Sequence, residues 1–266
     1  MTKILSGREL AGFIKERQAH LVRSLRGRKI IPTLLILRDS NNPVITKYVA
    51  LKKRYGSDIG VKVIDCLAQN TDELIKNIDA ANQNTDISAI IVQLPLANTD
   101  STDEVLSHIA KAKDVDGLSG SGNFDSATAT AINWLLTGYD ISLADKTIAL
   151  VGRGRLVGAP LYKMFKNSGY KVELFHRGSD LTSLKNFDVV ISATGKPHLI
   201  SSAYIKPGAV VVDAGTASED GILKGDVDDS VRARTDLAAI TPVLGGVGPM
   251  TVATLFENVI FAAQNP

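Results

Sequence analysis

The stretch 147–160 restricts the fold of this chain more than any other part of the sequence. Its apolar run, Ile148 to Val151, ends at Gly152, and two further glycines, Gly154 and Gly158, precede a helix-like segment. A glycine turn between a strand and a helix lets the backbone approach a phosphate, and the helix N-terminus offers free N–H groups. The spacing G-x-G-x-x-x-G is one residue longer than the usual dinucleotide fingerprint. The stretch therefore predicts either a dinucleotide site or an ordinary tight turn.

Segments of strand and helix character alternate along the whole chain. Short apolar runs typical of buried strands are interspersed with apolar residues at helical spacing. The predicted strands are 30–37, 61–67, 89–92, 147–151, 171–175, 187–192, 209–213 and 238–241. The predicted helices include one from Pro43 to about Ile59, one over 72–81 with Thr71 as its N-cap, and one over 158–167. This alternation predicts an α/β fold with parallel sheets covered by helices on both faces. The glycine- and serine-rich segment 118–125 predicts a crossing between two domains, and 250–263 predicts a terminal helix that returns to the first one.

The composition limits the class of protein. At 266 residues the chain is long enough for two modest domains, and its net charge of +2 is too small to indicate nucleic acid as a partner. The single cysteine, Cys66, excludes an intramolecular disulfide and favours a reducing compartment. Because the N-terminus lacks a signal-peptide core and no apolar run reaches the length of a membrane span, we expect a cytoplasmic protein without a membrane partner. The four histidines show no metal-ligand spacing, so no metal site is predicted.

Several polar residues follow the predicted strands, where ligands of parallel α/β sheets bind. Gln93 comes directly after the third strand, and Asp116 lies in the charged turn 113–117. Tyr48 and Lys52 stand four residues apart on a predicted helix and so share a face. A lysine in a desolvated site can act as a base because its pKa is lowered, whereas a Tyr–Lys pair on an exposed helix has no chemical role. Asp116 equally suits a turn without further function, and the spacing leaves these alternatives open.

The end of the strand 171–175 bears on the choice of cofactor. An NAD site usually carries an acid there for the ribose 2′-hydroxyl, whereas an arginine suits the 2′-phosphate of NADP. Arg177 follows this strand and favours NADP, while Glu173 and Asp180 lie close by and favour NAD. A surface arginine without a ligand is an equal alternative.

Eight stretches, taken together and in order, carry a family resemblance. They are Y-V-A-L-K at 48–52, V-Q-L-P-L at 92–96, K-D-V-D-G at 113–117, V-G-R-G-R-L-V-G-A-P at 151–160, A-T-G-K-P at 193–197, V-V-D-A-G at 211–215, G-D-V at 225–227 and T-P-V-L-G-G-V-G-P-M-T at 241–251. The chain resembles the bifunctional methylenetetrahydrofolate dehydrogenase/methenyltetrahydrofolate cyclohydrolase family, called FolD in bacteria. The last stretch is the most specific, and it differs from the family's usual run at Leu244, where proline is expected.

The resemblance implies a fold and an activity. It implies an N-terminal α/β folate-binding domain, 1–120 plus 249–266, and a Rossmann-like NAD(P)-binding domain, 121–248, with the terminal helix returning to the first domain. The cleft between them would host both reactions. These are oxidation of 5,10-methylenetetrahydrofolate to the 5,10-methenyl form with NADP or NAD, and hydrolysis of that form to 10-formyltetrahydrofolate. The family also implies a homodimer formed through the cofactor domain.

The resemblance also implies roles for single residues. Lys52 would be the catalytic lysine, Gln93 the glutamine that contacts and tunes it, and Tyr48 the aromatic that stacks on the substrate. Asp116 would anchor the pterin-like ring. The implied catalytic residues are thus Lys52, Gln93, Tyr48 and Asp116, and substrate binding adds Leu94, Pro95, Gly248 and Pro249. The implied cofactor-binding residues are Gly152, Arg153, Gly154, Val157, Gly158, His176, Arg177, Thr194, Gly195 and Thr216.

Some positions depart from the family pattern. Many members carry serine where this chain has Gly154, and the serine usually found three residues before the tyrosine is Ile45. The segments 119–123 and 126–129 replace the family's H-P-x-N-x-G and P-C-T-P runs. These departures bear on substrate affinity and on the balance of the two activities. Because Lys52, Gln93 and Asp116 are unchanged, we expect catalysis to persist.

Two other functions are consistent with parts of the sequence. Another NAD(P)-dependent dehydrogenase, of the amino-acid-dehydrogenase type, would explain the glycine turn but not the stretches at 48–52 and 241–251. A non-catalytic folate-binding relative would explain the departures.

Overall fold

The computed structural model describes residues 1–219 and 222–265. They form two compact units. The first unit consists of Phe13–Ala127 and Val252–Pro266, and the second of Met1–Gly12 and Thr128–Thr251. The N-terminal residues group with the second unit because the short strand β1 (Lys3–Ile4) pairs with a strand of that unit's sheet. The sequence contained no such expectation, and the predicted functional domains, 1–120 plus 249–266 and 121–248, stay predictions.

The first unit is built on a three-stranded parallel sheet with the order β3-β2-β4. Its strands are β2 (Thr33–Arg38), β3 (Lys62–Leu67) and β4 (Ala89–Val92). Its helices are α2 (Pro43–Ile59), α3 (Thr71–Gln83), the short η1 (Thr99–Ser101) and α4 (Thr102–Ser107), together with the residues of α1 (Gly7–Gly27) from Phe13 onward and of α8 (Val247–Gln264) from Val252 onward.

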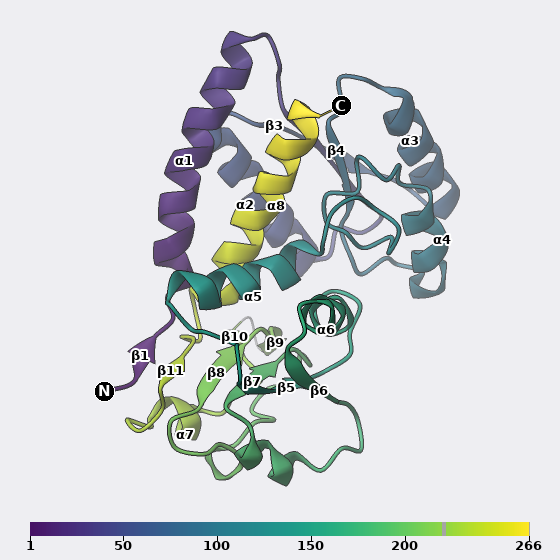
Figure 1. The fold of residues 1–266 in the computed structure, drawn as a ribbon. Helices are drawn as coiled ribbons and strands as arrows, with labels where there is room; N and C mark the ends of the chain where they lie inside the picture. Colours follow the sequence, from purple (N-terminus) through teal and green to yellow (C-terminus); the bar gives the residue numbers. More distant parts are fainter. Residues whose placement is uncertain (220–221, 266) are drawn as a thin grey trace. The chain divides into compact units, whose positions relative to one another are not determined.

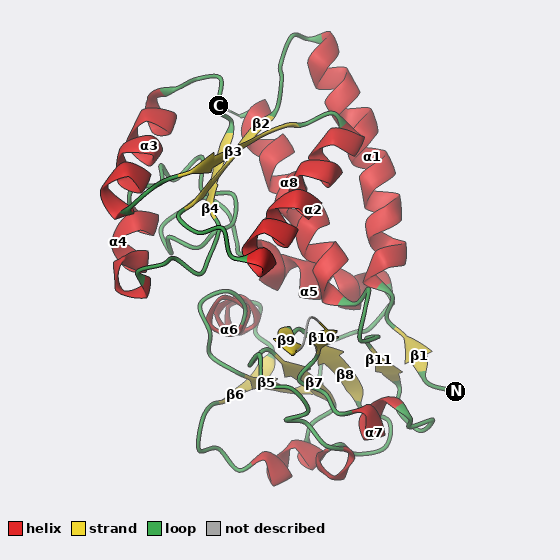
Figure 2. Cartoon of the chain, turned by 180° about the vertical axis from the view of Figure 1, so that it is seen from behind, coloured by secondary structure: helices red, strands yellow, loops and turns green. Residues whose placement is uncertain are grey.

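The central strand β2 supplies both halves of this unit's core. Because side chains alternate across a strand, Leu34 and Ile36 pack into a cluster with α1, α2 and α8. Leu35 and Leu37 pack on the opposite face, in a cluster with α3 and α4. Figures 1 and 2 show α1, α2 and α8 together on one side of the strands and α3 and α4 on the other. Helices therefore cover both faces, as the uninterrupted apolar run predicts.

Local signals set the ends of the helices in this unit. α2 begins at Pro43, after Asn42 has capped the Val44 N–H, and it ends at Gly60, whose φ of 84° is left-handed. The helix 72–81 was predicted with Thr71 as its cap, and this was wrong: α3 begins one residue earlier, because the Asn70 side chain accepts the Glu73 N–H at 2.9 Å.

The second unit contains a six-stranded parallel sheet with the order β1-β11-β8-β7-β5-β6. Its strands besides β1 are β5 (Thr147–Val151), β6 (Lys171–Phe175), β7 (Val189–Ser192), β8 (Val210–Asp213) and β11 (Ala239–Ile240). A separate antiparallel pair consists of β9 (Ala217–Glu219) and β10 (Ile222–Lys224). The helical segments are α5 (Ala127–Gly138), α6 (Gly158–Asn167), η2 (Leu181–Asn186), η3 (Ser202–Tyr204) and α7 (Asp229–Arg232).

The two sheets share one topological property. In the first unit the chain passes from β2 to β3 on one side and then to β4 on the other, and in the second from β5 to β6 and then to β7. Each sheet therefore has a point where the strand order reverses, between β2 and β4 and between β5 and β7. Ligands of open parallel sheets bind beyond the carboxyl ends of the strands at such points.

Candidate active site

Lys52 and Gln93 meet at the switch point of the first unit. Lys52 Nζ donates a hydrogen bond to Gln93 Oε1 at 2.6 Å, and both side chains are half-buried. Gln93 is the residue that follows β4, and its N–H bonds to the Leu37 carbonyl of β2 at 2.8 Å. The glutamine is thus held on the backbone between the two strands where the order reverses, and α2 brings the lysine to it.

The turn that carries Asp116 is attached to the same strand. Asp114 forms a parallel bridge with Ile90 of β4, and the Ile90 N–H bonds to the Lys113 carbonyl at 2.8 Å. The turn that follows needs a glycine, because Gly117 has a φ of 67° and a Cβ there would lie 2.6 Å from the Phe124 carbonyl oxygen. Asp116 is therefore positioned by backbone pairing at the end of β4 and not by its own side chain.

Lys113 anchors this turn to the C-terminal end of α3. Its ammonium donates to the carbonyls of Ala81, Asn82 and Asn84, at 2.8, 3.0 and 2.7 Å. These carbonyls lie at the C-terminal end of α3, where a cation is favoured by the helix dipole and by the unpaired C=O groups. The first lysine of the K-D-V-D-G stretch thus anchors the turn, while its last acid faces the lysine of α2.

Burial changes the titration of the two charged groups. It lowers the pKa of Lys52 from its ordinary value, and the negative charge of Asp116 partly offsets this. Burial raises the pKa of Asp116, and the positive charge of Lys52 opposes that shift, while Asp114 adds to it. Desolvation is the largest cause for both groups. The lowered pKa shifts Lys52 toward its neutral amine, which is the form that accepts a proton.

Of the other predicted substrate residues, Tyr48, Leu94 and Pro95 belong to the first unit, as Lys52 and Gln93 do, and Gly248 and Pro249 belong to the second. Tyr48 is half-buried on α2, one turn before Lys52. Leu94 is half-buried and Pro95 is exposed, directly after the glutamine, with a cis peptide bond between them. Gly248 and Pro249 lie in the first turn of α8, within the second unit. Their place relative to Lys52 stays a prediction.

The glycine turn lies at the switch point of the second unit. Gly152 follows β5 with a φ of 110°, and a Cβ there would lie 2.4 Å from the Ala193 carbonyl oxygen, just after β7. A Cβ on Gly158 would lie 2.0 Å from the Gly152 carbonyl oxygen, so the first turn of α6 packs directly on the turn. Gly154 differs, because a Cβ there meets none of the described atoms within 4 Å.

This turn fits the phosphates of a dinucleotide. The close approaches at Gly152 and Gly158 leave no room for side chains there, so a phosphate can come near the backbone, and the N-cap residue of α6, Val157, makes no side-chain cap. Arg153 is exposed in the turn and adds a positive charge. The structure thus brings Gly152, Arg153, Val157 and Gly158 together beside Thr194.

The remaining predicted cofactor residues follow the neighbouring strands. His176 and Arg177 are exposed in the turn after β6, Thr194 and Gly195 follow β7, and Thr216 follows β8. The acid Asp180, which had favoured NAD, is engaged elsewhere. Its carboxylate caps η2 by accepting the Thr182 N–H and hydroxyl at 2.9 and 2.7 Å, and these bonds lower its pKa. Asp180 therefore argues less for NAD than the sequence indicated, and Arg177 still favours NADP.

Sequence reasoning missed several residues that shape these sites. Lys113 and Asp114 had no role assigned to them, and neither had Asp213 and Asp226, although all four lie in the motif stretches. Asp114 is buried and accepts the Ser119 N–H at 3.0 Å, so it shapes the segment that departs from the family pattern. A buried acid inside a glycine-containing motif is the signal that was available for these residues.

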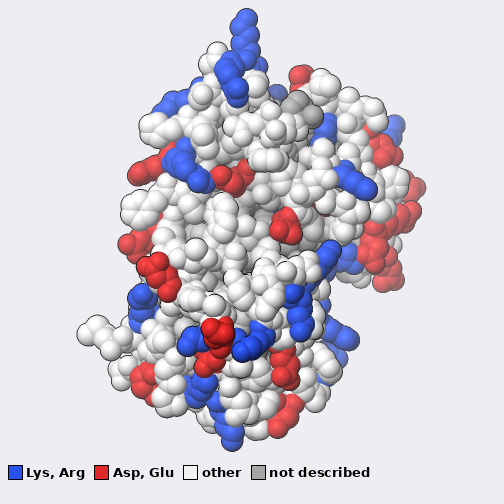
Figure 3. Space-filling model, in the orientation of Figure 1, with Lys and Arg blue, Asp and Glu red and all other residues white. Residues whose placement is uncertain are grey.

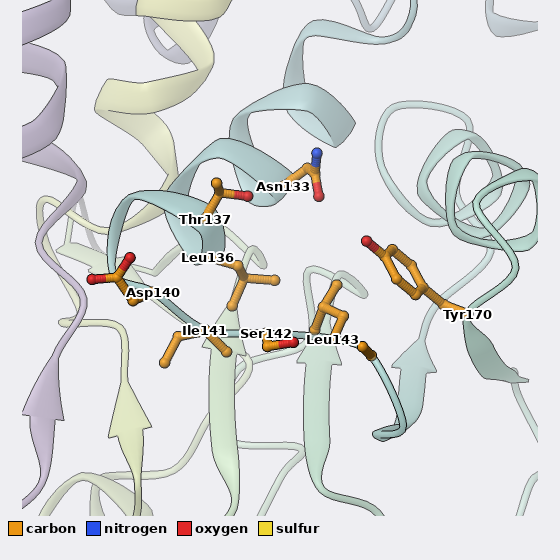
Figure 4. Close-up of a pocket in the computed structure, with 9 residues that line it drawn as sticks. Asn133, Leu136, Thr137, Asp140, Ile141, Ser142, Leu143 and Tyr170 are labelled. Carbon is orange, nitrogen blue, oxygen red and sulfur yellow. The ribbon is translucent and has the colours of Figure 1, made fainter.

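One pocket lies away from all the predicted residues. It measures about 370 Å³ and is lined by the end of α5, the segment 140–144 and Tyr170 (Figure 4). Its lining includes the polar side chains of Asn133, Thr137 and Ser142 and one charged side chain, Asp140. In Figure 3, acidic side chains gather over α3 and α4, while elsewhere on the visible face both signs are mixed. Neither feature competes with the two switch points as a site of catalysis.

Comparisons with known proteins agree with this geometry. Residues 5–116 match the model of the tetrahydrofolate dehydrogenase/cyclohydrolase catalytic domain, and residues 126–266 match the model of that family's NAD(P)-binding domain. The bifunctional protein FolD of Macrococcus caseolyticus is 35% identical over 277 residues, which cover 98% of each chain.

Solved structures of the family have the same fold. The crystal structure of the bifunctional FolD enzyme from Campylobacter jejuni matches with a TM-score of 0.94 and 33% identity, over 100% of this chain and 99% of that one. The FolD enzyme of Trypanosoma brucei, solved with NADP and an inhibitor, matches with a TM-score of 0.91 and 29% identity, over 99% and 97% of the two chains.

The chain belongs to the tetrahydrofolate dehydrogenase/cyclohydrolase family. It is a bifunctional enzyme: a methylenetetrahydrofolate dehydrogenase that uses NADP or NAD, and a methenyltetrahydrofolate cyclohydrolase. The predicted two-domain α/β fold and the family resemblance are confirmed, and the alternative of an amino-acid-dehydrogenase-like enzyme has no support. None of the helices formed by residues 1–219 and 222–265 is long and apolar enough to cross a bilayer.

Proposed function

We propose that Lys52 is the proton acceptor of the cyclohydrolase reaction and that Gln93 orients it. The observation that carries this proposal is the 2.6 Å hydrogen bond from Lys52 Nζ to Gln93 Oε1 in a site that lowers the pKa of the lysine. A neutral amine that donates one hydrogen to an amide oxygen keeps its lone pair for another partner. Water that attacks a cationic methenyl carbon must lose a proton, and the lone pair of Lys52 accepts it.

The cationic substrate reinforces this state of the lysine. A positive charge on the substrate's one-carbon bridge disfavours a second positive charge on Lys52. Asp116 is proposed to hold the pterin-like ring, because a carboxylate accepts hydrogen bonds from ring N–H groups at two oxygens. Tyr48 is proposed to stack on the ring. The further proposed substrate contacts are Leu94, Pro95, Gly248 and Pro249.

The cofactor is proposed to bind at the second switch point. Gly152 and Gly158 leave the backbone open to its phosphates, and Arg153 adds charge. When bound, the nicotinamide accepts the hydride from the one-carbon bridge, so the protein's task in the oxidation is to position two ligands. The proposed cofactor residues are those that the family resemblance implied: Gly152, Arg153, Gly154, Val157, Gly158, His176, Arg177, Thr194, Gly195 and Thr216.

We propose NADP as the preferred cofactor. Arg177 is exposed after β6, where a 2′-phosphate would lie, and Asp180 is held by its own cap. Glu173 is exposed on β6 and is the remaining acid close by. The ratio of kcat/KM for NADP and NAD, in the wild type and in Arg177→Ala, tests this preference. A preference for NAD in the wild type would reject it.

The role of Lys52 can be tested with a neighbouring lysine as the control. Lys52→Met should lower cyclohydrolase kcat by about 10²–10⁴, because it removes the general base, while folate binding persists. Lys53→Met is the matched control, since Lys53 is half-exposed on the same helix and lies 3.9 Å from Asp65. Hydrolysis is followed by the loss of methenyl-folate absorbance. Full activity of Lys52→Met would remove the lysine from the mechanism.

The functional domains, the assembly and the location are also proposals. Residues 249–266 are assigned to the folate-binding domain, and Leu255 and Phe256 of α8 support this because they are buried in the first unit's core. A homodimer is proposed from the family resemblance, and its mass in sedimentation equilibrium tests it. The single cysteine supports a cytoplasmic location, which cell fractionation can check.

A further inference from the structure

Two buried aspartates, Asp213 and Asp226, contact the turns proposed to bind the cofactor. Asp226 is 0% exposed and Asp213 is 8% exposed. Asp213 ends β8, and Asp226 lies in the segment after β10, so each belongs to a motif stretch without an assigned task. Strands β7 and β8 are neighbours in the sheet (Figure 1), and the turns that follow them contain Thr194 and Thr216.

Asp226 is bonded to the turn after β7. Its Oδ2 accepts the Thr194 N–H at 2.6 Å and the Ser192 hydroxyl at 2.7 Å. Its other oxygen, Oδ1, has no hydrogen-bond partner among the residues that the structure describes. A single carboxylate oxygen therefore holds the last residue of β7 and the backbone of Thr194 in the turn that follows, and the second oxygen occupies space beside the neighbouring turn.

The Asp226 carboxyl group limits the space available in the turn after β8. A Cβ on Gly215 would lie 2.0 Å from Asp226 Oδ1 and from its Cγ. The carboxyl group thus fills the space that a side chain at position 215 would take, directly before Thr216. One side chain therefore restrains both turns: it bonds to the backbone of Thr194 and packs against the backbone of Gly215.

Asp213 holds Asp226 in place. Its carboxylate accepts the N–H groups of Gly215, Asp226 and Val227, each at 3.1 Å. The guanidinium of Arg232 pairs with it at 2.5 Å. Three backbone bonds and an ion pair leave this carboxylate no freedom to rotate, so the Asp226 backbone is fixed relative to the end of β8.

We propose that Asp226 is a positioning residue for the cofactor, which keeps the turns 194–195 and 215–216 at the separation that NADP binding requires. The proposal rests on the proposed cofactor role of Thr194, Gly195 and Thr216. Asp226 does not touch the reacting atoms and acts through the backbone of Thr194. Because hydrolysis of the methenyl form needs no nicotinamide, the effect falls on the dehydrogenase and spares the cyclohydrolase.

The test compares substitutions that remove or keep the acceptor. Asp226→Ala should raise KM for NADP at least about tenfold, because a buried donor is left unpaired, while cyclohydrolase kcat stays within about twofold. Asp226→Asn should fall between the wild type and Asp226→Ala, since its amide oxygen can replace Oδ2 as the acceptor while its NH₂ becomes a buried donor at the place of the unpartnered Oδ1. Ser192→Ala, which removes one donor and perturbs the fold least, should raise KM about threefold.

Asp188→Ala is the matched control at the opposite ends of the strands. Asp188 accepts the Thr147 N–H at 2.8 Å and pairs with Lys206 at 2.8 Å, at the start of β5. Its loss should lower the melting temperature without changing KM for NADP. A merely structural role of Asp226 would give the same pattern in Asp226→Ala, and that result would overturn the proposal. If Asp226→Ala does not fold, an unchanged KM in Ser192→Ala overturns it instead.

The proposed cofactor site and the proposed role of Asp226 are rejected by different results. If the wild type binds no NADP in calorimetric titration, the proposed cofactor site is wrong. If the wild type binds NADP and Gly152→Ala weakens that binding while Asp226→Ala and Ser192→Ala do not, the site stands and the role of Asp226 is rejected.

Discussion

The two parallel sheets of this chain have the same kind of switch point but use buried charge in opposite ways. In the first unit, burial acts on groups that we propose to contact the substrate, and it shifts the pKa values of Lys52 and Asp116 toward their neutral forms. In the second unit, the buried carboxylates of Asp213 and Asp226 face backbone N–H groups, and what they determine is the shape of turns.

The difference follows from the two reactions. Hydrolysis needs a proton acceptor, and the pKa of such a group is adjusted most directly by desolvation. Hydride transfer to a cofactor needs no titrating side chain, so the protein contributes position alone. A chain with both activities therefore needs one site with adjusted titration and another with a rigid backbone. Substitutions should separate the two activities accordingly.

Among the substitutions in the second unit, the largest separation of the two activities is expected for Gly152→Ala. The substitution places a methyl group 2.4 Å from the Ala193 carbonyl oxygen and a side chain at a φ of 110°. A cost of about 2 kcal/mol or more, at roughly tenfold per 1.4 kcal/mol, predicts a fall in dehydrogenase kcat/KM of about thirtyfold or more. Cyclohydrolase kcat should persist.

Gly154→Ala provides the control for this substitution. It lies in the same turn, but its methyl group meets none of the described atoms within 4 Å. It should leave cyclohydrolase kcat unchanged and lower dehydrogenase kcat/KM far less than Gly152→Ala does. Equal losses of both activities in Gly152→Ala would contradict the separation between the two sites.

The second prediction concerns the pH dependence of cyclohydrolase kcat, which depends on Lys52 in the first unit. Protonated Lys52 has no lone pair, so cyclohydrolase kcat should rise about tenfold per pH unit until the lowered pKa of Lys52 is passed, and then level off. Asp116 raises that pKa, so Asp116→Asn should move the rising limb to lower pH. The pH–rate profiles of both proteins test the sign. A limb that stays in place, or moves to higher pH, would exclude Lys52 as the titrating group.

The smallest effect is expected for Gly154→Ser, which restores the residue that many family members carry. The space around this position admits the side chain, and one added hydrogen bond of about 1 kcal/mol lowers KM for NADP about fivefold. Cyclohydrolase kcat again serves as the internal control. An increase in KM would show that the turn is tighter than the structure indicates.

Elements with local signals could be predicted from the sequence. The helix from Pro43 to about Ile59 is confirmed, because proline suits its first turn and Gly60 its left-handed end. The strands 89–92, 147–151 and 171–175 and the helix 158–167 are also confirmed residue for residue. Such patterns depend on neighbours within a few positions, and those are visible in a linear chain.

The cap of α3 shows where local reasoning fails. Asn70 and Thr71 both suit an N-cap, and the choice between them depended on the surroundings of each side chain. The Thr71 hydroxyl lies 3.3 Å from the Ser101 hydroxyl, a residue thirty positions away, whereas Asn70 is exposed and free to bond to the Glu73 N–H.

For the candidate site, too, some features could be predicted from the sequence and others could not. The sequence was sufficient for the family and for Lys52, Gln93 and Asp116 as residues worth naming, since each lies in a motif. The contact between Lys52 and Gln93, 41 positions apart, was implied by the family resemblance and not by the residue pattern itself. The desolvation that shifts the pKa values of Lys52 and Asp116 could not be predicted from the sequence. Nor could the sequence assign Asp226 to the backbone of Thr194, 32 positions away. Burial and long-range bonds arise from packing, and a linear pattern of residue types does not contain them.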